Sequence, residues 1–166
     1  MGLEIERRFL VKYPGWKEWA GEPQPIRQGY LVSGELGFTV RIRIKAESKA
    51  WLTLKAPSEG IARHEFEYPI PLPDAESLWG LAEDRLVKTR FSLDLAGGDW
   101  VVDCFEEANA PLVLAEVELP TADTHVELPD WCGQEVTGIS LLSNAVLAKN
   151  PVNQWANEIR RIYSIE

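Results

Sequence analysis

Cysteine, histidine and methionine are scarce in this sequence of 166 residues, with two, two and one copies respectively. The two cysteines, Cys104 and Cys132, are far apart and form neither a CxxC pair nor a cysteine–histidine cluster. This spacing supports neither a disulfide framework nor a zinc knuckle. We expect thiols that pack as small apolar side chains.

Positive charge is also in short supply, since 17 basic residues stand against 26 acidic ones and give a net charge of −9. Without a global positive field, neither nucleic acid nor an anionic membrane is an expected partner. No apolar run is long enough to span a bilayer, and the charged start MGLEIERRFLV lacks a secretory apolar region. We therefore expect a cytoplasmic protein.

What the sequence does contain is a series of short stretches in which apolar and polar residues alternate. With 45% hydrophobic residues and no repeat or long linker, residues 1–166 are expected to form a single domain. About eight strands are predicted, most of them separated by Gly, Pro, Asp or Asn. They cover residues 3–11, 26–33, 37–46, 50–56, 62–71, 88–95, 99–106 and 112–119. Helices are expected after Pro73-Asp74, over AESLWGLAEDRL, and in SNAVLAKN and NQWANEIRRIY.

Almost every predicted strand has one charged face, because residues two apart share a side of a strand. The sign of the charge is sorted by strand. Acidic residues on such faces are Glu4, Glu6, Glu65, Glu67, Asp103, Glu116 and Glu118. Basic ones are Arg8, Arg41, Arg43, Lys55, Lys88 and Arg90.

A single charged face is ordinary for a sheet that points at water. The set as a whole favours another arrangement, in which helices cover the apolar face and an antiparallel meander curls its charged face inward and closes into a barrel. Like charges on one face repel unless a ligand compensates them. Paired carboxylates suit Mg²⁺ or Mn²⁺, and arginine suits phosphate oxygens. The interior is therefore predicted to bind a triphosphate-type polyanion through divalent metal ions.

Short motifs with this chemistry occur in a characteristic order. EIERRFLV at the start resembles the ExExK signature of the CYTH family, the triphosphate tunnel metalloenzymes. IRQGYL, VRIRI, LTLK, RHEFE, KTRF, DCF, AEVEL and SNAVLA follow in the order of that family. The resemblance covers nearly the whole chain. It implies a closed eight-stranded antiparallel tunnel, mainly β with a few flanking helices, and hydrolysis of inorganic triphosphate as the commonest activity of short bacterial members.

Residue roles follow from the resemblance, motif by motif. It implies that the phosphates contact Arg41, Arg43, Lys55, Lys88 and Arg90. It implies that the metal ligands are Glu4, Glu6, Asp103, Glu116 and Glu118, with one or both of Glu65 and Glu67. Arg8 occupies the signature position where the family has lysine, and it is a candidate catalytic residue together with Tyr30 of the QGY motif. Arginine remains protonated, so Arg8 can bind a phosphate oxygen but cannot accept a proton.

Two further hypotheses remain open on the sequence. One is a nucleotide enzyme of the same family, either a class IV type adenylate cyclase or a nucleoside or thiamine triphosphatase. The other is a polyphosphate-binding module without catalysis. The expected partner is tripolyphosphate or another small molecule that carries a triphosphate. Homodimer formation is compatible with the sequence, although no exposed apolar pattern points to it.

Overall fold

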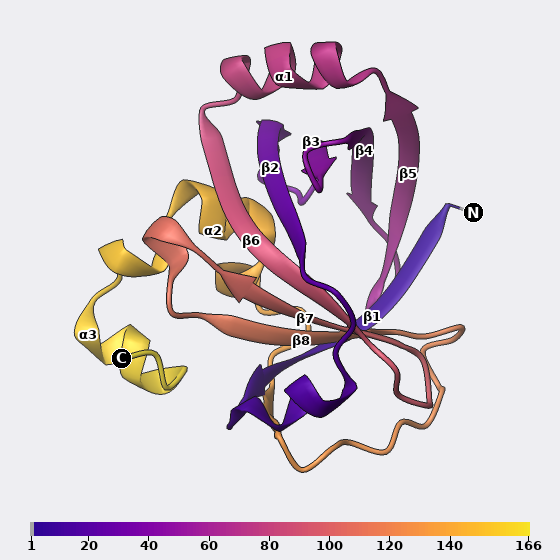
Figure 1. Ribbon diagram of the computed structural model, residues 1–166, viewed down its shortest axis with the longest axis vertical. Coiled ribbons are helices and arrows are strands. Elements are labelled where there is room, and N and C mark those ends of the chain that lie inside the picture. Colours follow the sequence, from indigo (N-terminus) through magenta and orange to yellow (C-terminus); the bar gives the residue numbers. More distant parts are fainter. Residues whose placement is uncertain (1) are drawn as a thin grey trace.

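The computed structural model describes residues 2–166, and within this range it contains nine β-strands and three α-helices (Figure 1). The strands are β1 (Leu3–Val11), β2 (Gln24–Ser33), β3 (Thr39–Lys45), β4 (Lys49–Pro57), β5 (Ala62–Ile70), β6 (Asp84–Leu93), β7 (Asp99–Phe105), β8 (Val113–Glu118) and β9 (Cys132–Glu135). The helices are α1 (Leu72–Leu81), α2 (Asn144–Lys149) and α3 (Asn157–Ile162), and a 3-10 helix, η1, covers Pro14–Trp19.

Strands β1 to β8 close into an antiparallel barrel. The neighbours run in the order β5-β4-β3-β2-β6-β7-β8-β1, and β1 pairs with β5 through Leu3–Ile5 to complete the ring. The other end of β1 pairs with β9, with Val11 opposite Cys132. The predicted closed eight-stranded architecture is therefore confirmed.

The order of the strands is not the simple meander that the sequence predicted. β1 and β2 are not neighbours, and α1 carries the chain from β5 across the barrel to β6, which pairs with β2. β6 begins at Asp84 rather than at residue 88, and α1 ends at Leu81 rather than continuing toward Leu86. The register explains the difference, because Asp84 and Leu86 pair with Tyr30 and Gln28 of β2.

The apolar faces of the strands lie outside the barrel and are covered from two sides. Helix α1 contacts β2, β3 and β4, where Ala75 packs with Ile44 and Ala50. Around β1, β7 and β8, η1 and the chain before β9 cover a second cluster. This cluster contains Phe9, Trp16, Trp100, Val102, Ala115, Val117, Val126 and Trp131.

The C-terminal segment fills one end of the barrel. Leu142 and Leu147 of this segment are fully buried and pack with Tyr30, Leu86 and Leu114, which lie on the inward-facing side of their strands. Figure 1 shows α2 beside β6, and α2 contacts both β6 and β2. Both predicted C-terminal helical segments are present, but α3 begins at Asn157 because the first residues of NQWANEIRRIY belong to a 3-10 turn, Val152–Gln154, and to residues 155–156. Within residues 2–166, no helix combines the length and apolarity needed to cross a membrane.

Candidate functional site in the barrel interior

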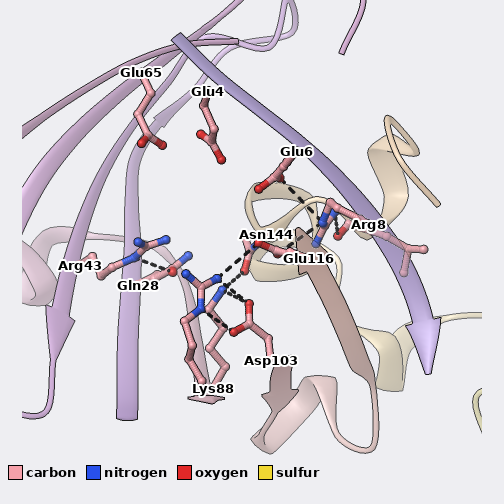
Figure 2. Close-up of polar contacts among 12 residues, drawn as sticks. Glu4, Glu6, Arg8, Gln28, Arg43, Glu65, Lys88, Asp103, Glu116 and Asn144 are labelled. Atoms are coloured by element: carbon pink, nitrogen blue, oxygen red, sulfur yellow. Dashed lines mark hydrogen bonds and ion pairs between the residues drawn. The ribbon is translucent and has the colours of Figure 1, made fainter. Parts of the chain in front are cut away.

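The charged faces of the strands meet inside the barrel, as the alternation predicted. Acidic side chains come mainly from β1 and β8, while basic ones come from β3, β4 and β6. Figure 2 shows Glu4, Glu6 and Glu65 on one side of a shared space and Arg43 and Lys88 on the other. The interior therefore has an acidic wall that faces a basic wall.

A first group at one end of the interior joins β1, β4 and β5. Lys55 Nζ lies 2.7 Å from Glu4 Oε2 and 3.1 Å from Glu65 Oε2. Burial opposes ionisation of Glu4, but the Lys55 ammonium and neighbouring carboxyl groups outweigh it and hold the pKa of Glu4 below its ordinary value. Burial and the contact with Glu4 raise the pKa of Glu65 to about 7. Burial also raises the pKa of Glu118, with help from Glu4 and Asp99.

A second group joins β1 and β8 around Arg8. Its Nε lies 3.4 Å from Glu116 Oε1 and 4.0 Å from Glu6 Oε1, and its Nη1 donates a hydrogen bond of 2.8 Å to the carbonyl oxygen of Leu142. Burial, followed by repulsion from Glu116 and Glu4, raises the pKa of Glu6 well above its ordinary value. Glu6 thus lies where negative charge is in excess.

A third group centres on Asp103, which is wholly buried. Its oxygens lie 2.7 Å from Lys88 Nζ and 2.7 Å from Arg90 Nε, and Lys88 Nζ also donates to Asn144 Oδ1 at 2.9 Å. Burial lowers the pKa of Lys88 to about 7 despite the attraction of Asp103. Burial would raise the pKa of Asp103, but Arg90 and Lys88 hold it far below its ordinary value. Asp103 therefore orients two cations in this arrangement.

The basic wall is held by polar residues of β2 and β4. Arg43 Nε donates to Gln28 Oε1 at 2.9 Å, and Gln28 Nε2 donates to Tyr30 Oη at 3.1 Å. Arg41 Nη2 donates to Thr53 Oγ1 at 3.2 Å, and the Thr53 hydroxyl donates to Glu67 Oε2 at 2.9 Å. Burial, with Arg41 and Arg90 nearby, lowers the pKa of Arg43 to about 10.

Two buried guanidinium groups retain donors that have no hydrogen-bond acceptor within the described residues. These donors are Nε and Nη2 of Arg8 and Nε of Arg41. An unpaired buried donor is costly, so such atoms call for an oxygen-rich partner. Phosphate oxygens have the chemistry that they require.

The carboxylates do not form one compact metal cluster. Across residues 2–166, no group of three or more His, Cys, Asp or Glu side chains is arranged to hold a metal ion, because cations separate the carboxylates into the groups above. The donor set nevertheless fits a divalent ion, since Glu4, Glu6 and Glu116 are hard oxygen ligands and Glu6 is crowded by the other two. A cation there would relieve that repulsion.

Sequence reasoning missed three polar residues of this interior. Gln28 and Thr53 have the same strand parity as Tyr30 and Lys55, which was the available signal, but neutral side chains did not stand out among charges. Asn144 lies in the SNAVLA motif, yet only the folded chain places it beside Lys88. The inward positions of the predicted site residues agree with their strand parity.

Comparisons with known proteins converge on one family. The family model for the CYTH domain matches residues 2–148. The inorganic triphosphatase of Acetivibrio thermocellus is 40% identical over 157 residues, which cover 93% of this chain and 99% of that protein. The inorganic triphosphatase of Nitrosomonas europaea is 37% identical over 150 residues, or 87% of this chain and 96% of that protein.

Solved structures agree in fold. A crystal structure of an inorganic triphosphatase has a TM-score of 0.62 and 35% identity, and the match covers 87% of this chain and 93% of that chain. A protein from Bacillus halodurans has a TM-score of 0.57 over all of this chain and 93% of its own, at 18% identity. The second likeness concerns the fold alone.

Proposed function

We propose that this chain, which belongs to the CYTH domain family, hydrolyses inorganic triphosphate inside its barrel with a divalent cation as cofactor. The observation that carries the proposal is the pair of opposed walls, with Arg43 and Lys88 across the shared space from Glu4 and Glu6 in Figure 2. Arg90 Nη2 lies 3.4 Å from Glu116 Oε2 between them. Relatives that are 37–40% identical over nearly their full lengths are inorganic triphosphatases, which supports this choice of substrate.

The basic wall would bind the substrate. Tripolyphosphate carries several negative charges, and Arg41, Arg43, Lys55, Lys88 and Arg90 offer matching donors within one closed interior. Asp103 holds Lys88 and Arg90 in position before the substrate arrives, and Gln28 does the same for Arg43. Preorganised cations cost little reorganisation when charge develops on the phosphoryl group.

The acidic wall would hold the cofactor, Mg²⁺ or Mn²⁺. When bound, such an ion supplies charge neutralisation at phosphate oxygens and a more acidic water molecule. Glu4, Glu6 and Glu116 would be its main ligands, because Glu6 is crowded by the other two. Glu65 shares Lys55 with Glu4 and could join them, while Glu67 is bonded to Thr53 and Glu118 is the last residue of β8. Asp103 would contribute only if it released a cation partner.

Arg8 and Tyr30 would act on the substrate in different ways. Arg8 is paired with Glu116 and anchored to Leu142, so it would bind a phosphate oxygen and fix the acidic wall rather than take a proton. Tyr30 Oη accepts a hydrogen bond from Gln28, which leaves its own proton available for a phosphate oxygen or a leaving group.

We also infer that residues 1–166 act as one domain. The chain beyond the family match contributes Val152, Trp155 and Ile165 to the same apolar cluster as Leu147. Removing that segment would therefore expose the end of the barrel.

Phosphate release by the purified protein tests the proposed function. Tripolyphosphate, pyrophosphate and ATP are compared in Mg²⁺, in Mn²⁺ and in EDTA. We expect metal-dependent release that is selective for tripolyphosphate. Cyclic AMP or ADP as the main product from ATP would instead favour a nucleotide enzyme, and tight binding of tripolyphosphate without release under any metal would favour a binding module.

A further inference from the structure

A cavity of about 670 Å³ lies outside the barrel, and its lining residues include those of the β6–β7 connection, which is at the end opposite α1 in Figure 1. Its walls come from η1, from the β6–β7 connection around Leu95–Gly97 and from the chain segment 125–131. Trp100, which lines it, belongs to the outer cluster of β7 rather than to the charged interior. We call this cavity the outer pocket, and it is of the size that holds small molecules in other proteins.

Aromatic side chains form much of the outer pocket. Trp100 and Trp131 are buried and meet edge to face with ring centroids 5.8 Å apart, while Tyr13 and Trp19 are about half exposed. Two large exposed rings next to a cavity leave apolar surface and π-faces available to a ligand.

The titratable groups that line the outer pocket, apart from the tyrosine, are three acidic side chains and one histidine. Glu18, Glu127 and Asp130 line it, and no lysine or arginine does. Across residues 2–166, the side chains of these three acids form neither an ion pair nor a hydrogen bond. Acidic groups beside aromatic faces favour a cation, because both attract positive charge.

A buried donor adds an independent requirement. Trp131 is 4% exposed, and its Nε1 has no hydrogen-bond acceptor within the described chain. The neighbouring indole atom Cδ1 faces Gly15, another lining residue, where an added Cβ would lie 3.3 Å away. Cδ1 is bonded to Nε1, so the donor edge of this indole lies at the Gly15 wall of the outer pocket, where it is shielded from solvent. A ligand oxygen that enters at this wall would satisfy the N–H.

The walls are fixed to the barrel by main-chain hydrogen bonds. Lys12 N donates to the Trp131 carbonyl oxygen at 2.8 Å, and Asp94 N donates to the Trp19 carbonyl oxygen at 3.0 Å. Ala20 forms a β-bridge with Leu93. The aromatic rings are thus carried on anchored backbone, which lowers the entropy that binding must overcome.

We propose that the outer pocket binds a small organic ammonium ion that carries a hydroxyl, ether or carbonyl oxygen. The ammonium group lies against Trp19 and Tyr13 within the field of Glu18, Glu127 and Asp130, and the oxygen accepts the Trp131 indole N–H. The site is separate from the barrel interior, so it gives the protein a second ligand of opposite charge to the triphosphate.

Choline is a suitable probe, because it combines a quaternary ammonium with a hydroxyl group. Its binding is followed through the magnetic resonance signals of the tryptophan indole N–H groups. We expect choline to shift the Trp131 and Trp19 signals and to bind about tenfold more tightly than its uncharged analogue, in which carbon replaces nitrogen. Tetramethylammonium, which lacks the hydroxyl, should leave the Trp131 N–H without an acceptor and should bind more weakly than choline.

Matched variants separate the site from general effects. Trp19→Ala should weaken choline binding about tenfold, whereas Phe38→Ala, which removes a similarly exposed aromatic ring elsewhere, should not. Trp131→Phe should weaken choline binding but not tetramethylammonium binding. Equal affinity for choline and its uncharged analogue, no shift of either indole signal, or the same affinity in Trp19→Ala and Phe38→Ala would overturn the proposal. None of these readouts uses phosphate release.

Discussion

Lys88 Nζ lies 2.7 Å from Asp103 Oδ2, and both side chains are completely excluded from solvent. Arg90 completes the group with its own contact of 2.7 Å to Asp103. One carboxylate thus pairs with two cations of the proposed phosphate-binding wall.

Replacing Asp103 should therefore destabilise the protein strongly. Asp103→Ala leaves two cations without their shared partner, and breaking a buried ion pair in this way costs about 3–5 kcal/mol. Urea unfolding of this variant beside Asp99→Ala, an exposed acid of the same strand, measures the difference. Equal stability of the two variants would contradict the role assigned to Asp103.

Arg43 should contribute to substrate affinity. Its guanidinium is held by Gln28 and faces the acidic wall, so loss of a charge-assisted contact in Arg43→Ala should weaken tripolyphosphate binding by about 2 kcal/mol. Isothermal titration in the presence of Mg²⁺ measures this change. The control is Arg161→Ala, which removes an exposed arginine near the C-terminus. If Arg43→Ala binds tripolyphosphate as tightly as this control, Arg43 lies outside the binding site.

Much of the site follows from a local rule. Side chains alternate along a strand whatever the fold, so the faces that carry Glu4 and Glu6 or Arg41 and Arg43 could be predicted before the barrel was known. The order of the strands could not, because the pairing of β2 with β6 joins residues far apart in sequence. β9 was missed since CGQE is short, polar and contains glycine.

The boundary between α1 and β6 shows the same limit. Four residues of AEDRL, all except Asp84, are good helix formers, yet pairing of Leu86 with Gln28 outweighs that local preference. The place of Asn144 in the site could not be predicted for a related reason, since its contact with Lys88 joins residues 56 positions apart.

Arg7 and Glu135 should give the protein a small pH-dependent stabilisation. Two hydrogen bonds of 3.0 and 2.7 Å from Arg7 lower the pKa of Glu135 from its ordinary 4.5, although burial opposes the shift. A lowered folded-state pKa stabilises the fold above the ordinary pKa, and this contribution is lost as the pH falls through the folded value. The pair is partly exposed, so Glu135→Gln should cost about 0.5 kcal/mol at neutral pH.

Unfolding of Glu135→Gln and the parent protein at neutral pH and near pH 3 measures this dependence. The cost should shrink at the lower pH, because a protonated Glu135 resembles glutamine. A cost that grows as the pH falls would contradict the direction of the shift.

Cys132 should react slowly with alkylating reagents. Burial raises the pKa of its thiol to about 11, and only the thiolate is nucleophilic. In a Cys104→Ser background, iodoacetamide should modify the folded protein more slowly than free cysteine at neutral pH, and the rate should rise with pH well beyond pH 8. A plateau near the ordinary thiol pKa would contradict this prediction.

The most direct test of the proposed site is phosphate release from tripolyphosphate by Glu116→Gln, measured with Mg²⁺ and Mn²⁺ beside Glu59→Gln. Glu116 is buried between Arg8 and Arg90, whereas Glu59 is exposed in the β4–β5 connection. The two variants therefore remove the same charge from a buried and from an exposed position. We predict that Glu116→Gln keeps the fold and loses metal-dependent release on the order of a hundredfold or more, while Glu59→Gln matches the parent protein. If the parent protein hydrolyses tripolyphosphate and a folded Glu116→Gln variant does so at the same rate, the reaction takes place outside this interior.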